Sequence, residues 1–69
     1  MPQHSQGFER HVMIFFDAVL AANGTILFNG IPEATKIFIR EHASDLEPDC
    51  IVMRGRDLNE FSLEEYLKL

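Results

Sequence analysis

The sequence lacks a second cysteine and any long uninterrupted apolar run, and each absence excludes something. Cys50 is the only cysteine among 69 residues, so an intrachain disulfide is impossible. The most apolar stretch, VMIFFDAVLAANG at residues 12–24, contains Asp17 and is shorter than the roughly 20 apolar residues that a transmembrane helix needs. We therefore expect no membrane segment, and the lone thiol fits a cytoplasmic protein.

The same stretch has some features of a secretion signal, because Arg10 precedes an apolar run that ends in small residues. These features conflict with their neighbours. Glu9 neutralises Arg10, Asp17 interrupts the apolar run, and cleavage near Ala22 would leave too short a chain to fold without a disulfide. The sequence therefore favours a cytoplasmic protein over a secreted one.

Basic residues are also scarce, with six Lys and Arg against eleven Asp and Glu, and the net charge is −5. Residues 1–40 are balanced, whereas residues 41–69 hold eight acids and three bases and carry the whole excess. Nucleic acids and anionic membranes bind clustered Lys and Arg. Direct binding to either is therefore not expected.

A chain of this length forms one domain, 1–69, in which we expect residues 1–6 to be flexible. The spacing of the three histidines predicts no metal site, and no glycine-rich loop predicts a phosphate or cofactor site. Without a disulfide or a metal, self-association is the remaining way to stabilise so small a domain. We therefore expect a homodimer without cofactors.

Helical periodicity predicts a long N-terminal helix that ends at Asn23-Gly24. On a helical wheel, Phe8, Val12, Phe15 and Val19 lie on one line, and Asp17 lies opposite. The apolar arc is wider than one core requires. We therefore predict that this helix carries a dimer or partner interface, formed by Arg10, Met13, Ile14, Asp17 and Leu20.

The rest of the chain predicts alternating strands and helices. Residues 25–28 read as a strand, Pro32 begins a helix that runs to about Ala43, and residues 50–53 read as a buried strand. Residues 57–61 are predicted to pair with that strand as an irregular hairpin.

A short C-terminal helix is predicted from Leu63, because Ser62 and Glu65 match a capping box and Phe61 and Tyr66 match a hydrophobic staple. The predicted fold class is therefore α+β, a small two-layer domain. Its sheet has two or three strands, packed with the long N-terminal helix, a second helix and the short C-terminal helix.

Two groups of residues could carry chemistry or binding. The Arg54-Gly55-Arg56-Asp57 turn presents two guanidinium groups, so Arg54, Arg56 and Asp57 form a predicted partner-binding hairpin, although internal ion pairing would also explain them. Glu41, His42 and Cys50 would be the candidates for an enzyme site at a dimer interface. Cys50 is more simply a core residue, and Glu41 lies in a last helical turn where it can reach water.

No set of acid, base and nucleophile is jointly placed, so the sequence favours a non-enzymatic module. Its predicted role is to bind and modulate another protein as a homodimer, either as an inhibitor or as an adaptor. One alternative is an acidic nucleic-acid mimic that occupies the groove of a basic protein. The acids that would form this mimic are Asp45, Glu47, Asp49, Asp57, Glu60, Glu64 and Glu65. The other alternative is the small enzyme or ligand site described above.

Overall fold

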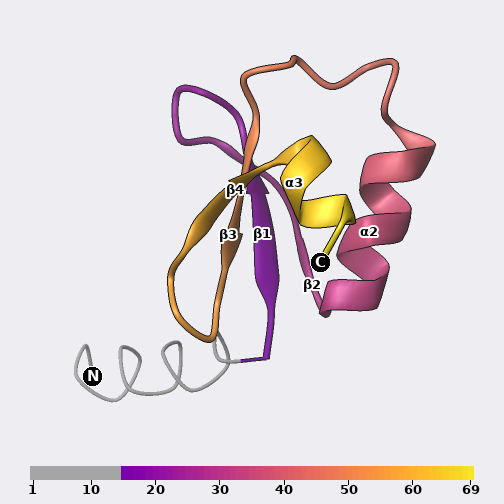
Figure 1. The fold of residues 1–69 in the computed structure, drawn as a ribbon. Helices are drawn as coiled ribbons and strands as arrows, with labels where there is room; N and C mark the ends of the chain where they lie inside the picture. Colours follow the sequence, from indigo (N-terminus) through magenta and orange to yellow (C-terminus); the bar gives the residue numbers. More distant parts are fainter. Residues whose placement is uncertain (1–14) are drawn as a thin grey trace, which may run out of the picture.

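The computed structural model describes residues 15–69. A short strand, β1 (Asp17–Leu20), is one of the two inner strands of its sheet. The sheet is antiparallel and has the strand order β2-β1-β3-β4. Figure 1 shows the elements that follow β1 along the chain: β2 (Ile26–Gly30), α2 (Pro32–Glu41), β3 (Ile51–Arg54), β4 (Glu60–Ser62) and α3 (Leu63–Leu67).

The prediction of a long N-terminal helix is wrong for residues 17–20, which form β1. Side chains alternate along this strand: Asp17 and Val19 are buried, whereas Ala18 and Leu20 are partly exposed. A short apolar run is compatible with helix or strand, and here hydrogen bonding to β2 and β3 on both sides favours the strand. Residues 8–14 of the predicted helix lie outside the described residues.

Gly24 has a role that differs from the predicted helix cap. It has a φ of 90° and lies in the β1–β2 connection, where its N–H donates to the Ala21 carbonyl at 2.9 Å. The left-handed conformation that makes glycine a good helix terminator suits a tight turn equally well.

The predicted sheet of two or three strands is also wrong, because the described residues form four. The α+β class is correct, and α2, β2 and β3 fall close to the predicted ranges. The C-terminal capping box is confirmed: the Ser62 hydroxyl accepts from the Glu65 N–H at 3.1 Å, and the Glu65 carboxylate accepts from the Ser62 N–H at 3.0 Å.

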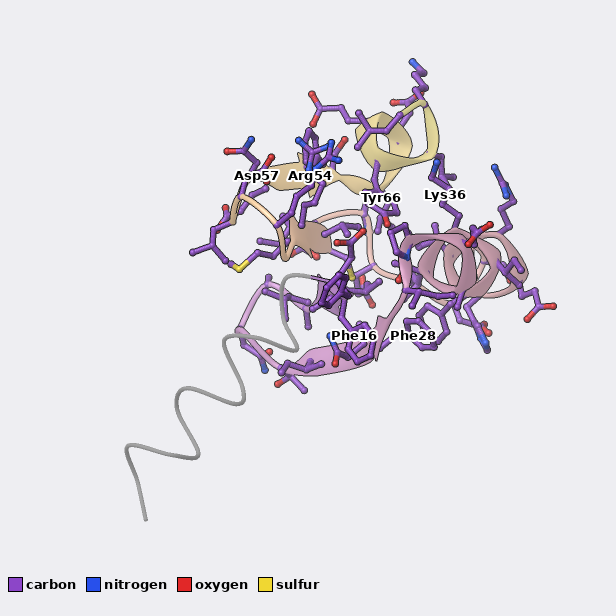
Figure 2. All side chains as sticks on the ribbon, turned by 90° about the horizontal axis from the view of Figure 1, so that it is seen from below. Phe16, Phe28, Lys36, Arg54, Asp57 and Tyr66 are labelled. Atoms are coloured by element: carbon purple, nitrogen blue, oxygen red, sulfur yellow. The ribbon has the colours of Figure 1, made fainter. Side chains whose placement is uncertain are left out.

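The helices α2 and α3 lie on the same side of the sheet (Figure 1 and Figure 2). Between the two layers is a core of Val19, Ile39, Val52 and Tyr66, with partly buried apolar side chains around it. The Phe28 ring stacks on Phe38 of α2 with centroids 4.6 Å apart. This packing fixes Tyr66 and β1 against each other, which positions the site described below.

The other face of the sheet carries apolar side chains that no described helix covers. Leu20 has two cross-strand neighbours, Ile26 on β2 and Ile51 on β3, and Ala18 is paired with Met53. We call these five side chains the open-face strip. Ile26, on the edge strand β2, is 63% exposed.

Among residues 15–69, no helix has the length and apolar character needed to cross a lipid bilayer.

Candidate binding site

Asp17 is the structural centre of the site. Its side chain is only 3% exposed, and each carboxylate oxygen accepts one hydrogen bond. The Gly55 N–H donates to Oδ1 at 3.1 Å, and the Tyr66 hydroxyl donates to Oδ2. Burial of a carboxylate is costly without such partners. The helical wheel, which places Asp17 opposite the apolar line, is therefore wrong about its surroundings, because the strand turns this side chain toward the helices.

Tyr66 is held in place by α3, whose capping box and whose contact between the Phe61 and Tyr66 rings, 6.5 Å apart, orient the short helix. Burial raises the pKa of the Tyr66 hydroxyl far above its ordinary value, and the hydrogen bond to Asp17 and the charge of Asp17 raise it further. Tyr66 is therefore a stable hydrogen-bond donor throughout the physiological pH range.

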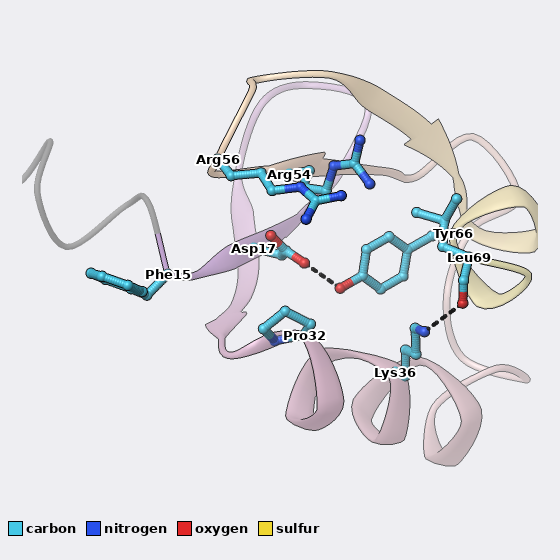
Figure 3. A pocket seen from close by; sticks show the side chains of 8 residues that line it. All are labelled: Phe15, Asp17, Pro32, Lys36, Arg54, Arg56, Tyr66 and Leu69. Carbon is cyan, nitrogen blue, oxygen red and sulfur yellow. Dashed lines mark hydrogen bonds between the residues drawn. The ribbon is translucent and has the colours of Figure 1, made fainter.

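A cavity of about 160 Å³ opens beside this pair; we call it the Asp17 cavity. Figure 3 shows the Asp17–Tyr66 hydrogen bond on its inner wall, with Arg54 and Arg56 on one side and Pro32 and Lys36 on the other. Its remaining lining is apolar and is formed by Phe15 and Leu69. The cavity therefore combines charged groups with apolar walls.

Positive charge is concentrated around the Asp17 cavity. Residues 15–69 contain five Lys and Arg and ten Asp and Glu, yet three of these bases and only one of these acids line the cavity. The bases are Lys36, Arg54 and Arg56, and the acid is Asp17. Most of the described cations of this acidic chain therefore lie at one opening. This arrangement favours an anionic or hydrogen-bond-accepting ligand.

Two of the three cations already have partners. The Lys36 ammonium donates to the Leu69 main-chain oxygen at 2.9 Å and lies 5.9 Å from the centroid of the Tyr66 ring. Arg54 pairs with Asp57 at 2.6 Å, and its guanidinium lies 5.0 Å from the centroid of the Phe61 ring. Arg56 is exposed and has no hydrogen-bonded or ion-paired partner within residues 15–69. Arg56 is therefore the cation most available to a ligand.

The Arg54–Asp57 pair also shifts the titration of both groups. The hydrogen bond from Arg54 lowers the pKa of Asp57, and the same bond raises the pKa of Arg54. Both groups are therefore charged at neutral pH. Figure 2 shows the pair at the end of the sheet, away from α2.

The segment that joins β3 to β4, residues 54–59, is a well-bonded turn that we call the 54–59 hairpin. The Leu58 N–H donates to the Arg54 carbonyl at 2.7 Å, and the Arg54 N–H donates to the Asn59 carbonyl at 2.9 Å. The Asn59 N–H also donates to Asp57 Oδ1 at 3.1 Å. These bonds connect the turn to itself and to the end of β3, and the bond from Gly55 to Asp17 connects it to β1.

Leu58 is unusual in this hairpin. Its φ is +60°, which is costly for a residue with a Cβ, and its side chain is 58% exposed. Burial in the described core does not offset the cost. Strained, exposed positions of this kind are found at ligand-contacting turns.

The structure separates the predicted interface residues. Asp17, Arg54 and Arg56 meet at the Asp17 cavity, and Asp57 joins them through Arg54. Leu20 lies on the opposite face of the sheet, in the open-face strip. The remaining members of the predicted interface lie outside the described residues: Arg10, Met13 and Ile14.

Among the residues of the cavity with polar side chains, two were not predicted as site residues, Tyr66 and Lys36. The sequence identified Tyr66 only as part of a hydrophobic staple, and nothing in it linked the Tyr66 hydroxyl to Asp17. Lys36 gave no signal at all, because a lysine on the surface of an amphipathic helix is ordinary. Only the fold brings both residues to Asp17.

The other candidate residues lie elsewhere. Glu41 and His42 are exposed at the end of α2, where the His42 ring lies 4.5 Å from that of Phe38, and Cys50 is buried with 2% exposure. None of the three lines the Asp17 cavity. The seven acids proposed for a nucleic-acid mimic are all exposed and are spread over the α2–β3 loop, the hairpin with β4, and α3.

Comparison of the chain with protein-family models, curated proteins and solved structures finds no match. The site must therefore be interpreted from its own geometry.

The size of the Asp17 cavity limits what it can hold. At about 160 Å³, it is close to the volume of a cavity that holds one benzene molecule and is smaller than the roughly 300–1,000 Å³ typical of pockets for drug-sized ligands and cofactors. Within residues 15–69, no group of three or more His, Cys, Asp or Glu is placed to hold a metal ion. The cavity therefore suits a group the size of one side chain.

Proposed function

We propose that this protein is a non-enzymatic interaction module that binds and modulates another protein, and that the partner docks on the 54–59 hairpin and the mouth of the Asp17 cavity. The observation that carries this proposal is the exposed Leu58 side chain at a φ of +60° on a turn fixed by several hydrogen bonds. Beside it lie a partly apolar cavity and Arg56, an exposed cation that makes no hydrogen bond or close ion pair with residues 15–69.

An exposed apolar side chain, a neighbouring arginine and a small cavity are features of protein-binding surfaces. Interfaces use a rigid, preorganised apolar group with an adjacent arginine and a small pocket that receives one anchoring side chain. Because the hairpin is already ordered, a partner would not have to supply the free energy of ordering it. In a turn that contacts only solvent, the Leu58 side chain would add no packing energy to offset the cost of its φ. Glycine or asparagine would adopt this φ at lower cost.

The state of Asp17 supports the absence of catalysis. Both of its oxygens already accept hydrogen bonds, from Tyr66 and Gly55, so the carboxylate is engaged in holding the fold. The candidate nucleophile Cys50 does not line the cavity. The buried reduced thiol of Cys50 also fits the cytoplasm, which we propose as the site of action.

We also propose that the module acts as a homodimer, with a second copy of the chain covering the open-face strip. The strip is apolar and self-complementary under two-fold symmetry, and it continues to the edge strand β2, which carries no charged residue. The opposite edge strand, β4, is shorter and carries Glu60, which discourages pairing there. Dimerisation and partner binding would then use different faces.

The partner proposal is tested by quantitative capture from source cells with the wild-type chain and three variants. Leu58→Glu and Arg56→Glu change the hairpin, whereas Lys68→Glu makes the same charge change as Arg56→Glu at an exposed position outside it. One stoichiometric partner that is retained by wild type and Lys68→Glu and lost by both hairpin variants supports the proposal. Equal capture by the hairpin variants, or capture of no stoichiometric partner, would overturn it.

The dimer proposal is tested by molar mass from light scattering at micromolar concentration. We expect twice the chain mass for wild type, and a single-chain mass with retained secondary structure for Leu20→Glu or Met53→Glu. Ile37→Glu is the matched control, because Ile37 is an exposed apolar residue on α2, far from the strip in the fold, and this variant should remain dimeric. A single-chain mass for wild type would contradict the proposal.

A further inference from the structure

The cations around the Asp17 cavity already interact with negative or dipolar groups of the described structure. Lys36 donates to the Leu69 main-chain oxygen, and Arg54 is hydrogen-bonded to Asp57. The pKa of Asp57 is lowered mainly by this bond from Arg54 and in part by the charge of Arg56. None of the three cations therefore requires a bound anion as its counter-ion, and an electron-rich but uncharged group can be the ligand.

The inner wall of the cavity makes a charged ligand unfavourable. It is formed by the buried Asp17 carboxylate and the Tyr66 hydroxyl that is bonded to it (Figure 3). An anion that entered the cavity would approach the negative charge of Asp17, and a cation would first have to pass the bases at the opening. An uncharged ligand meets neither repulsion.

The shape of the cavity suits one flat ring. Arg54 and Arg56 lie on one side and Pro32 lies on the other, so a flat group can enter between these two walls (Figure 3). The volume of about 160 Å³ is close to that of a cavity that holds one benzene molecule. The space therefore matches a single aromatic ring.

An aromatic ring also suits the cations, because the face of the ring is electron-rich and a guanidinium stacks on it. The fold already makes contacts of this kind next to the cavity. The Arg54 guanidinium lies 5.0 Å from the centroid of the Phe61 ring, and the Lys36 ammonium lies 5.9 Å from that of Tyr66. Arg56 is exposed and makes no hydrogen bond within residues 15–69, so its guanidinium can make the same contact with a ligand.

From these features we infer that the Asp17 cavity binds one uncharged aromatic ring, which lies between Pro32 and the Arg56 guanidinium. In the cell, the ring would be a phenylalanine or tyrosine side chain of the partner protein, an assignment that rests on the proposed function. Aromatic side chains that fill small pockets often supply much of the binding energy of a protein interface. The partner would then place this anchor in the cavity and contact Leu58 beside it.

The experiment titrates the full chain with small probes and follows nitrogen-15 amide shifts by NMR. p-Cresol corresponds to the side chain of tyrosine, toluene corresponds to that of phenylalanine, and both are uncharged at neutral pH. 4-Methylcyclohexanol has nearly the size of p-cresol without the aromatic ring, and butyrate is the charged comparison. Arg56→Gln removes the guanidinium. Arg40→Gln is the matched control, because Arg40 is also exposed but lies in the last turn of α2 and does not line the cavity.

We expect saturable shifts at Gly55, Arg56 and Tyr66 with both ring probes, and the tighter of the two indicates which side chain the partner uses. 4-Methylcyclohexanol should bind about threefold more weakly than p-cresol, because it cannot make the cation–ring contact. Butyrate should also bind more weakly than p-cresol. Arg56→Gln should largely remove the preference for p-cresol over 4-methylcyclohexanol, and Arg40→Gln should keep it, whereas a merely structural role of Arg56 would weaken both probes equally.

Four results would overturn the inference. They are the absence of saturable shifts with both ring probes, shifts confined to the open-face strip, tighter binding of butyrate than of either ring probe, and an unchanged preference for p-cresol in Arg56→Gln.

Because the probes need no partner, this test is separate from the capture experiment. A hairpin-dependent partner without ring binding would remove the aromatic inference and leave the proposed function intact. Ring binding without any captured partner would support the ligand class and overturn the proposed function.

Discussion

The Tyr66 hydroxyl donates a hydrogen bond to the carboxylate of Asp17, which lies 49 residues earlier in the chain. This bond joins the central strand β1 to the last helix, α3, and forms the inner wall of the Asp17 cavity. The two residues are far apart in the sequence, so the contact depends on the packing that brings β1 and α3 together. The pair therefore links the stability of the fold to the geometry of the binding site.

The first prediction concerns the strength of this link. Tyr66→Phe leaves Asp17 with one hydrogen bond fewer in a buried position, so we expect the free energy of unfolding to fall by about 1–3 kcal/mol. Asp17→Asn should have an effect of similar size. The single carboxamide oxygen can accept from either the Gly55 N–H or the Tyr66 hydroxyl, and the N–H₂ group then faces the other donor. Urea unfolding followed by circular dichroism measures both.

The double variant tests whether the two residues act together. If the bond carries the effect, Asp17→Asn with Tyr66→Phe will cost less than the sum of the two single changes. Asp45→Asn, at an exposed position in the α2–β3 loop, is the control and should leave the free energy of unfolding nearly unchanged. Additive single effects would show that the bond contributes little.

The second prediction concerns alkaline pH. Tyr66 is the only tyrosine and the chain has no tryptophan, so tyrosinate absorbance reports Tyr66 alone. Because its pKa is raised in the folded protein, Tyr66 keeps its proton above pH 10, where the unfolded chain has lost it. The unfolded state then binds fewer protons than the native state, and the Tyr66 contribution to stability falls as pH rises, by up to about 1.4 kcal/mol per pH unit.

We therefore expect tyrosinate absorbance to appear together with unfolding, and not as a separate titration near pH 10. Below the ordinary pKa of tyrosine this contribution is fully present. Tyr66→Phe should remove the Tyr66-dependent part of the decrease and leave any part due to lysines. Ionisation of Tyr66 near pH 10 in a chain that is still folded by circular dichroism would contradict the prediction.

The third prediction concerns Leu58. Glycine adopts a φ of +60° freely, whereas a residue with a Cβ loses about 1–2 kcal/mol there and glycine itself costs about 0.5–1 kcal/mol in chain entropy. Because Leu58 is largely exposed and little burial is lost, Leu58→Gly should leave stability unchanged or raise it by up to about 1 kcal/mol.

The same variant should weaken binding of the captured partner, because the exposed side chain is removed. Thermal unfolding and partner capture, measured on one preparation of Leu58→Gly, separate the two effects. A loss of stability of more than about 1 kcal/mol would mean that Leu58 packs in the fold, and unchanged capture would mean that the partner does not use it.

The fourth prediction concerns the C-terminal cap. Ser62→Ala leaves the Glu65 N–H without its acceptor, and Glu65→Ala leaves the Ser62 N–H without its own, so each should lower the free energy of unfolding by about 1 kcal/mol. Because α3 positions Tyr66, both variants should also broaden the Tyr66 signals in NMR. Glu64→Ala removes a neighbouring acid that is not part of the box and serves as the control.

Local signals in the sequence were sufficient for several elements. Pro32 and the apolar spacing after it predicted α2, and the Ser62–Glu65 box predicted α3, because capping and helical periodicity depend on residues within one or two turns. A turn at residues 54–57 was likewise predicted as a hairpin that carries Arg54, Arg56 and Asp57, and the structure has these residues in the 54–59 hairpin.

Only the tertiary structure decided which secondary structure residues 17–20 adopt and which residues form the site. An apolar run with one acid can serve as a helix or as a strand, and pairing with β2 and β3 on both edges made it β1. That pairing turned Asp17 inward, opposite the side expected for a helix. The partners of Asp17 are Gly55 and Tyr66, and separations of 38 and 49 residues leave no local pattern to read. The sequence by itself determined the acidic balance, the lone thiol and the local caps, whereas the Asp17 cavity arose from contacts that only the complete sheet brings together.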